Sequence, residues 1–432
     1  MGSQHTHKAH YDVDEFDLLL VTASDIHGVS RGRFVFRKSV HGIMKNGLGM
    51  AQASLFSGVL CDIPLCLTEY GDQGWTNGTL VPDSTTVRPL SWLSYGDKKV
   101  GHVLCDFLSS QGEREVSMSR EVANRQVQGL NDLGYVISVS AQLEVMVFHK
   151  NSLNPVLLHE DITTLTNTLM TSLLSSGIPV ISIGKGLEPG KLLIGLEPQT
   201  NLEVADCLHR LRSMLKSLCV NAGYDVTFMT RPLASISPNI VSYRFTLLDA
   251  NGRNVFDAAD DQMTLSEVGQ GFAAGLLAHQ QAMTALVRPT LNCYSQESPD
   301  ITVSWTNDPT HSSARLLIDN SQTGPHIEDR LPTLASNPYI ALASIIAAGT
   351  LDIRKKLKLS PELSDSTPDE EGPQTLLEAL DRLEKDETLT AALCPKFVKR
   401  FLLLKKNFEI NRLEEKSSDR FEFERSIYLR AL

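Results

Sequence analysis

From Ser119 onward the chain alternates amphipathic helices that stop at glycine with apolar strands, and this alternation constrains the fold more than any other feature. The first helix is expected to begin with Ser119 as its cap and to stop at Gly134, and the strand YVISVSAQLEVMVF follows directly. Two later helices stop at Gly177 and Gly223. Helical and strand periods that follow each other this closely must share one core. The pattern predicts a large domain that mixes strands and helices.

The chain before this region reads as a smaller, strand-rich domain. DLLLVTASDIHGVSRGRFVF predicts a hairpin with its turn at residues 25–28, and GHVLCDF predicts another buried strand. The predicted fold class is therefore α+β. The expected divisions are a disordered tail at 1–12, a β-rich domain at 13–110, and a larger domain at 111–432 that contains an acidic loop at 360–374. His5, His7 and His10 could bind a transition metal, but a disordered polar terminus is the favoured interpretation.

Further helices are expected in the second half. Leu265 to Val287 and Pro338 to Gly349 each carry a helical apolar pattern. LLEALDRLEKDETL and FVKRFLLLKKNFEINRLEE are amphipathic, and such stripes normally pack within one subunit, although a terminal pair can also reach a neighbour.

Composition excludes several classes of protein. A formal net charge of -11 disfavours binding to nucleic acid or to anionic membranes, and no apolar run is long enough to cross a bilayer. The seven cysteines are scattered, which is typical of reduced thiols. With a polar N-terminus that lacks a signal-peptide pattern, the expected location is the cytoplasm.

Common catalytic motifs are missing, but the second half carries a rarer set. The chain contains no GxGxxG after a strand, no phosphate-binding GKS or GKT, no CxxC and no HExxH. It does contain TFMTRP at 227–232, LLDANGRNVF, GLLAHQQAMTALVRPTLNCY and IEDRLPTLASNPYIALASIIAAG at 327–349. With these motifs, and with Asp25-x-x-Gly28-x-x-Arg31-Gly32 near its start, the chain resembles the class I glutamine synthetases over nearly its whole length.

The resemblance implies a fold, an assembly and a chemistry. The expected fold is an N-terminal β-grasp domain and a C-terminal catalytic-type α/β domain, and the expected partner is the chain itself in a ring-shaped homo-oligomer, a dodecamer in the family pattern. Family members join glutamate to ammonia through a γ-glutamyl phosphate, with ATP and two divalent cations, Mg²⁺ or Mn²⁺. The cations neutralise charge on the transferred phosphoryl group, and they need oxygen or imidazole ligands.

Most of those ligand positions have lost their chemistry in this sequence. Where the family has E-x-E-F, this chain has Gln142 before Glu144. An ungapped alignment through Pro189-Gly190 puts Gly186 and Leu193 at the next two acidic positions, and Lys191 at a glutamine. Neither an amide, a glycine nor a leucine replaces a carboxylate ligand.

The remaining family positions are mixed. Ser242 stands at a metal-binding histidine and Arg244 near a second one, Gln296 replaces the arginine that holds the glutamate carboxylate, and Thr310 replaces another arginine. Three positions keep their family residue, namely Arg315, Glu328 and Arg330. Each metal site thus keeps one carboxylate, Glu144 or Glu328, and these two are only weak candidates for metal ligands. The favoured interpretation is that they form ion pairs, Glu328 with Arg330, and Glu144 with Arg231 or Arg244.

The resulting hypothesis is a non-catalytic protein of the glutamine synthetase family, most similar to its lengsin branch, which binds no cofactor and acts as an oligomeric structural scaffold. The lengsin resemblance also implies intermediate-filament proteins as partners. One alternative is an active ATP-dependent ligase that uses Mg²⁺ or Mn²⁺ and joins glutamate to ammonia or another amine, with Glu188 or Asp249 rebuilding the metal site. Another is a regulatory subunit that joins rings of an active relative.

Overall fold

The computed structural model describes residues 11–61, 77–93, 95–156, 162–258, 265–294, 302–310, 314–321, 324–355, 358–359, 362, 372–411 and 420–432. The expected histidine-containing tail, Gln296, and most of the acidic loop at 360–374 lie outside these residues. Among the described helices, none combines the length and apolar character needed to cross a bilayer.

The N-terminal part is a mixed six-stranded sheet with the order β2-β1-β6-β4-β3, in which β5 also pairs with β6. Its strands are β1 (Leu18–Ser24), β2 (Ser30–Phe36), β3 (Leu48–Ala51), β4 (Asn77–Pro82), β5 (Arg88–Pro89) and β6 (Val100–Leu108), and its helix is α1 (Arg37–Asn46). The predicted hairpin is β1 and β2, and Gly28 in its turn has a left-handed φ of 81°. The parallel pairing of β1 with β6 places the first and last long strands side by side.

The second sheet has nine strands, in the order β13-β14-β15-β12-β7-β9-β8, with β10 and β11 also paired to β7. They are β7 (Val136–His149), β8 (Val180–Lys185), β9 (Lys191–Leu196), β10 (Gln199–Thr200), β11 (Tyr224–Thr227), β12 (Ile240–Leu248), β13 (Thr302–Thr306), β14 (Ala314–Ser321) and β15 (Gly324–Asp329). Residues along β7 and β12 alternate between fully buried and more accessible, so one face of this sheet packs on helices and the other is open.

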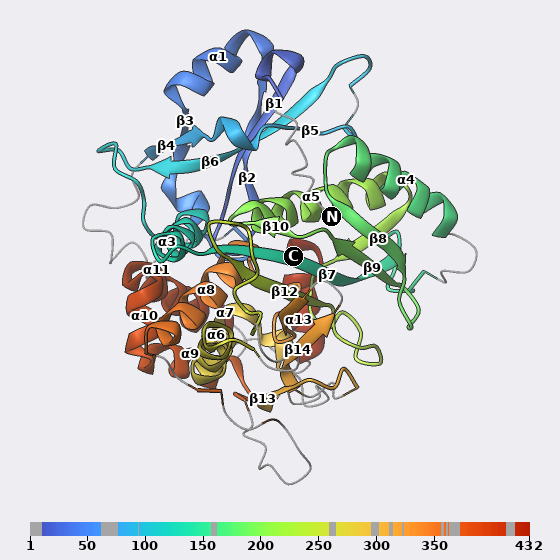
Figure 1. Cartoon of the computed structure of the whole chain (residues 1–432). Coiled ribbons are helices and arrows are strands. Elements are labelled where there is room, and N and C mark those ends of the chain that lie inside the picture. The colour runs from blue at the N-terminus through green and yellow to red at the C-terminus, as the bar shows by residue number, and fades with distance from the viewer. Residues whose placement is uncertain are drawn as a thin grey trace.

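Helices cover the buried face and fill the space beside it. They are α3 (Ser119–Asn131), α4 (Ile162–Ser175), α5 (Glu203–Asn221), α6 (Glu267–Ala278), α7 (Gln280–Val287), α8 (Pro338–Lys355), α9 (Leu376–Lys385), α10 (Glu387–Leu393), α11 (Pro395–Leu404) and α13 (Arg420–Ala431), with a π-helical stretch, η5 (Lys405–Ile410), after α11. Figure 1 shows the N-terminal sheet in blue at the top and the orange and red C-terminal helices gathered beside α3 at the lower left.

Two helix predictions need correction. The single helix expected from Leu265 to Val287 is two helices, α6 and α7, which meet at His279. At this break the His279 ring lies 2.6 Å from a carboxylate oxygen of Asp386. Ser119 begins α3 but does not cap it, because its hydroxyl donates to the backbone carbonyl of Asp25.

The contact between the two sheets is polar and buried. Arg120 on α3 forms ion pairs with Asp83 and Asp106 of the N-terminal part, at 2.8 and 3.0 Å, and with Asp206 on α5 at 3.0 Å. Three carboxylates from three separate segments thus share one guanidinium, and their charge keeps the pKa of Arg120 above its usual value despite burial. Arg120 therefore ties the N-terminal sheet to the helical layer.

Candidate functional site

The open face of the nine-stranded sheet collects five of the positions that the family resemblance singled out. In the antiparallel ladders Ser242 faces Gln142, and Leu193 faces Glu144. On the far side of β12, Arg244 is directly opposite Glu328. The intervening residues of β7 are fully buried on the other face. Strand alternation therefore places Gln142, Glu144, Leu193, Ser242 and Glu328 on one surface.

Glu328 is held by two arginines. Its Oε2 accepts from Arg244 Nε at 2.6 Å, and its Oε1 accepts from Arg330 Nε at 3.1 Å. The carboxylate is 6% exposed, so these charge-assisted bonds replace its hydration. The expected pair with Arg330 forms, and Arg244 is an additional partner that the sequence reasoning had not assigned to it.

Of the two partners expected for Glu144, Arg244 is wrong, because it pairs with Glu328. The pairing with Arg231 stays a prediction. The cation that acts on Glu144 most strongly is Lys191 at the start of β9. Burial raises the pKa of Glu144, Lys191 opposes this rise, and Glu188 adds to it. A Glu144 oxygen also lies only 3.4 Å from the position that a Cβ would take on Gly186. The carboxylate therefore sits among the turn residues that join β8 to β9.

Lys191 is fully buried, although the sequence placed it only as a replacement for a glutamine. Its Nζ donates to the carbonyl of Pro238 at 2.9 Å and to Oδ1 of Asn239 at 3.0 Å. Burial lowers its pKa to about 8, against the opposing effect of Glu144 and Glu188, and Arg231 lowers it further. Nothing in the sequence predicted this burial, and the only available signal was a lysine where the family has a neutral side chain.

The two acids considered as replacement ligands lie in different places. Glu188 lies in the turn before β9, where its carboxylate accepts from the backbone N–H of Ser237 at 3.0 Å and from the Ser237 hydroxyl. Asp249 follows the opposite end of β12 and accepts from Arg253 Nε at 2.8 Å. Five residues of strand separate it from Arg244, roughly 16 Å. Glu188 is therefore close to Glu144, and Asp249 is distant from the site.

Two other predicted positions, Arg315 and Thr310, do not lie on this face. Arg315 is completely buried, and it donates to both carboxylate oxygens of Asp329, at 3.0 and 2.7 Å, and to the carbonyl of Leu276 on α6. Thr310 lies in an exposed turn and donates to Asp308. Gln296 is outside the described residues. The structure thus makes Arg315 part of the packing between β14, β15 and α6.

The metal chemistry of the family does not fit the residues that are present. No group of three or more His, Cys, Asp or Glu side chains capable of holding a metal ion occurs within the described parts of the chain. The two carboxylates of the open face already have cationic neighbours supplied by the chain itself. A divalent ion would have to displace an arginine from Glu328 and approach a buried ammonium beside Glu144.

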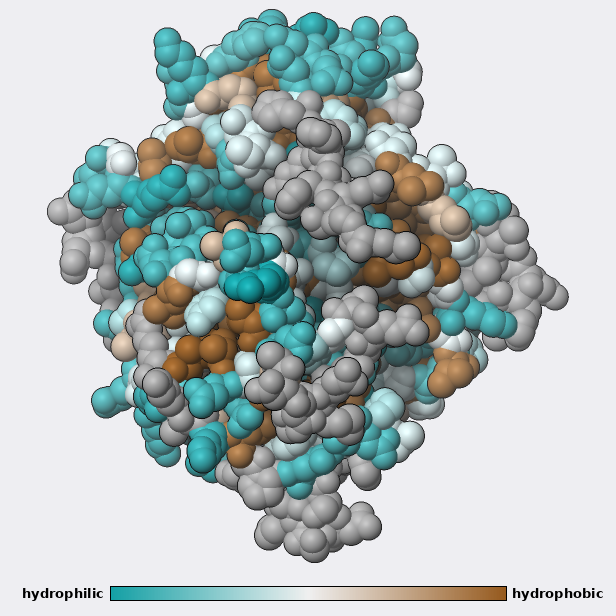
Figure 2. Space-filling view, in the orientation of Figure 1, coloured by the Kyte–Doolittle hydropathy of each residue, from teal (hydrophilic) through white to brown (hydrophobic). Residues whose placement is uncertain are grey.

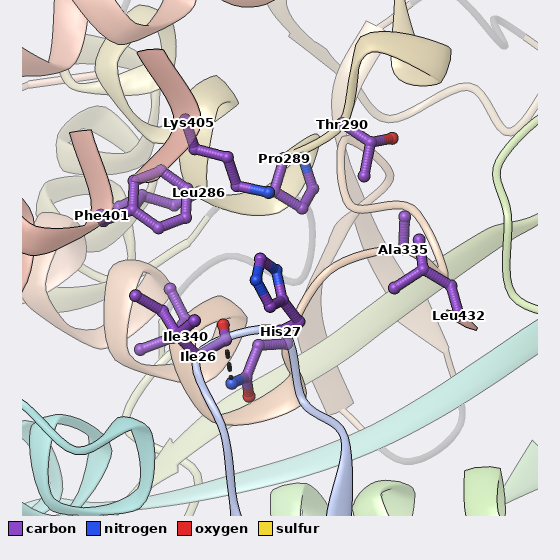
Figure 3. A pocket seen from close by; sticks show the side chains of 11 residues that line it. Ile26, His27, Leu286, Pro289, Thr290, Ala335, Ile340, Phe401, Lys405 and Leu432 are labelled. Atoms are coloured by element: carbon purple, nitrogen blue, oxygen red, sulfur yellow. Dashed lines mark hydrogen bonds between the residues drawn. The ribbon is translucent and has the colours of Figure 1, made fainter. Parts of the chain in front are cut away.

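Two hollows elsewhere include none of these positions. A cavity of about 10 Å³ lies where the β1–β2 turn meets α7, α8 and α11, and His27 and Lys405 face it from opposite sides (Figure 3). It has room for about one water molecule at most. An open cleft of about 380 Å³ lies between α7 and α9 and is lined by Gln281, Arg382 and Asp386, among others.

Comparison with known proteins identifies the family. The model of the glutamine synthetase catalytic domain matches residues 117–426. The chain belongs to the glutamine synthetase family. This places the open face of the nine-stranded sheet in the catalytic domain of that family.

The similar proteins in this family include a lengsin, a glutamine synthetase and a ligase for another amine. Over 434 residues the chain is 27% identical to lengsin of Canis lupus familiaris, covering 93% of this chain and 72% of that protein. It is 27% identical over 291 residues to a glutamine synthetase of Halobacterium salinarum, covering 62% of this chain and 63% of that enzyme. It is 26% identical over 369 residues to a glutamate–isopropylamine ligase of a Pseudomonas species, covering 79% of each. The ligand-free structure of GmaS shares the fold, with a TM-score of 0.81 at 22% identity over 95% of this chain and 96% of that one.

Proposed function

We propose that this protein is a non-catalytic member of the glutamine synthetase family, similar to lengsin, and that it acts as an oligomeric structural scaffold. One observation carries the proposal, the clamp of Arg244 and Arg330 on Glu328. Both oxygens of that carboxylate are engaged by guanidinium groups of the same chain.

The clamp removes the chemistry that the family reaction requires. Phosphoryl transfer to a carboxylate needs cations that neutralise the phosphate oxygens and the developing charge. Ser242 and Leu193, on the same face, supply neither a carboxylate nor an imidazole, and Arg244 repels a cation that approaches Glu328. Turnover should therefore be lower than that of an active synthetase by several orders of magnitude, because the electrostatic contribution is usually the largest one.

The scaffold part of the proposal concerns assembly into rings. Large apolar side chains are exposed on α4 and β8, with Met170 44%, Leu174 72% and Ile181 64% accessible. Figure 2 shows hydrophobic residues gathered over this region, at the right of the view. Contiguous apolar surface favours association, and further copies of this chain are the partner that family membership supports. Intermediate-filament proteins are a second class of partner, proposed on the likeness to lengsin alone.

A second candidate function is an ATP-dependent ligase that joins glutamate to an amine. Two observations favour it. Glu188 lies close enough to Glu144 to act on its pKa, and the relatives include a glutamate–isopropylamine ligase and a γ-glutamylanilide synthase. In this alternative Glu188 would leave Ser237 and join Glu144 around a divalent ion, with Mg²⁺ or Mn²⁺ and ATP as cofactors.

Release of ADP distinguishes the two functions. The purified protein is incubated with ATP, glutamate and Mg²⁺ or Mn²⁺, and with ammonia, isopropylamine or aniline in turn, beside an active synthetase as reference. Glu328→Ala is the matched control, because it removes the carboxylate without altering the face around Glu144. ADP release that does not depend on glutamate and does not exceed that of Glu328→Ala with any amine supports the scaffold. Glutamate-dependent ADP release that this substitution abolishes would overturn it.

Assembly is measured separately. Mass photometry of the full-length protein gives the number of subunits, and replacing Leu174 by Gln tests the apolar region. Rings that persist in the wild type and dissociate in Leu174→Gln support the assembly proposal, whereas a monomeric wild type contradicts it.

A further inference from the structure

The ammonium of Lys191 lies in a site that is built to hold it. The carbonyl of Pro238 and Oδ1 of Asn239 accept from Nζ, and Asn239 is itself fully buried. The amide of Asn239 donates to the carbonyls of Met229 at 2.8 Å and Thr227 at 3.1 Å. These bonds turn the oxygen of the amide toward Lys191. The lysine is therefore oriented by a fixed polar framework and does not simply fill space.

Two carboxylates, Glu144 and Glu188, act on this ammonium through their charge. Lys191 is opposite Met146 in the ladder between β7 and β9, so it shares a face with Glu144, which is two residues away along β7. Glu188 comes from the turn before β9 and is fixed by Ser237. Arg231 is the other cation that acts on Lys191. The local charges are thus two acids and two bases, and Lys191 lies diagonally across the ladder from Glu144, whose direct partner on β9 is Leu193.

We propose that Lys191 is a tethered cation, which takes the place of a divalent ion beside Glu144 and excludes it. The proposal rests on the proposed non-catalytic function and deepens it, because it names what occupies the cation position near β7. A primary ammonium accepts the same type of surroundings, carbonyl and carboxylate oxygens, that a hard divalent ion requires. The ammonium is positively charged, as a metal ion is, so it repels a metal ion that approaches Glu144. Because the ammonium is covalently attached to the chain, its presence in the site does not depend on any concentration in solution.

The first prediction concerns binding of Mn²⁺ alone, without nucleotide or substrate. Lys191→Gln keeps a hydrogen-bond donor of similar length and removes the charge. Lys185→Gln is the matched control, since Lys185 is exposed on the neighbouring strand β8. Free Mn²⁺ is followed by its electron paramagnetic resonance signal. The wild type and Lys185→Gln should bind little Mn²⁺ up to about 1 mM, the range of weak oxygen-ligand sites. Lys191→Gln should bind about tenfold more tightly, and Glu144→Gln in the same background should remove the gain.

The contrary results are distinct. Stoichiometric Mn²⁺ binding by the wild type that Glu144→Gln abolishes overturns the proposal, and this measurement does not depend on any lysine variant folding. A folded Lys191→Gln protein that binds no more Mn²⁺ than the wild type also overturns it. Either result, obtained together with silent ADP release, leaves the non-catalytic proposal standing, because that proposal rests on Glu328. Glutamate-dependent ADP release would instead remove the proposed function itself.

Discussion

Asn337, at the start of the segment NPYIALASIIAAG, is predicted to contribute strongly to stability through the contact between the β1–β2 turn and the start of α8. Its side-chain amide donates to the backbone carbonyls of Asp25 at 3.0 Å and Ile26 at 3.3 Å, and to the hydroxyl of Ser119 at 2.9 Å. Its oxygen accepts from the backbone N–H of Tyr339 at 3.0 Å, the bond of an N-terminal cap on α8. Asn337→Ala removes all four bonds at a position that is only 3% exposed.

The magnitude follows from these four bonds. Loss of the cap on α8 costs about 1 kcal/mol. After the substitution, the carbonyl of Asp25 still accepts from the hydroxyl of Ser119. The carbonyl of Ile26 loses the bond from the Asn337 amide. A buried polar group that loses its partner costs about 1–3 kcal/mol. The sum is about 3 kcal/mol in the free energy of unfolding. For a chain of 432 residues this corresponds to a fall of about 3 °C in Tm.

The assay is a thermal scan of Asn337→Ala beside Asn221→Ala, whose asparagine is exposed at the end of α5 and should change Tm by less than about 1 °C. Hydrogen exchange then locates the effect. The turn at residues 25–28 and the first turn of α8 should exchange faster in Asn337→Ala, with β7 unchanged. If Asn337→Ala has the Tm of the control, or if its exchange rises evenly over the chain, the reasoning that Asn337 joins the β1–β2 turn to the start of α8 is wrong.

Three further predictions concern charge. Burial lowers the pKa of Lys191 from 10.5 to about 8, so the folded state loses this proton at a lower pH than the unfolded state does. The free energy of unfolding should therefore rise by about 3 kcal/mol as the pH goes from 8 to 10.5. Urea titrations of Lys191→Met should lack this rise. Burial, and next the charge of Arg212, lower the pKa of His209 to about 3, so only the unfolded state takes up a proton on this histidine between pH 7 and pH 5. The free energy of unfolding should therefore fall by about 2 kcal/mol over this range, and by less in His209→Gln. An equal fall in both proteins would contradict this. Asp329→Ala leaves Arg315 buried without its carboxylate and should cost about 3–5 kcal/mol in chemical denaturation, whereas a cost below 1 kcal/mol would show that the pair is dispensable.

The sequence predicted well the turns and helix ends at glycines and the strands with alternating apolar residues, because these features depend on local conformation. The turn at residues 25–28 and the strand β7 lie where the periodicity placed them. The break between α6 and α7 was missed, since a single helical pattern runs through His279 and the contact with Asp386 comes from over a hundred residues away. Such breaks depend on tertiary contacts that no local pattern contains.

The candidate site shows the same limit at the level of single side chains. The alignment singled out Glu144 and Glu328, which lie on one face, but it paired Arg244 with Glu144 instead of Glu328. Strand register decides the partner of Arg244. On β12, Arg244 is opposite Glu328 of the neighbouring strand β15, whereas the residue of β12 opposite Glu144 of β7 is Ile240. The burial of Lys191 could not be predicted for a different reason, namely that lysine is rarely buried and no local pattern marks the exceptions.

The bond between Asn337 and Asp25 has a consequence for synthesis of the protein, because its two residues are 312 positions apart. A ribosome that adds roughly 5–20 residues per second needs about 15–60 s to travel that distance. During this interval the β1–β2 turn has emerged, but the residue that fastens it has not been made. Apolar residues of the turn such as Ile26, which is 4% exposed in the finished protein, are then open to other nascent chains on the same messenger. The β1–β2 turn therefore stays without this bond until α8 leaves the exit tunnel.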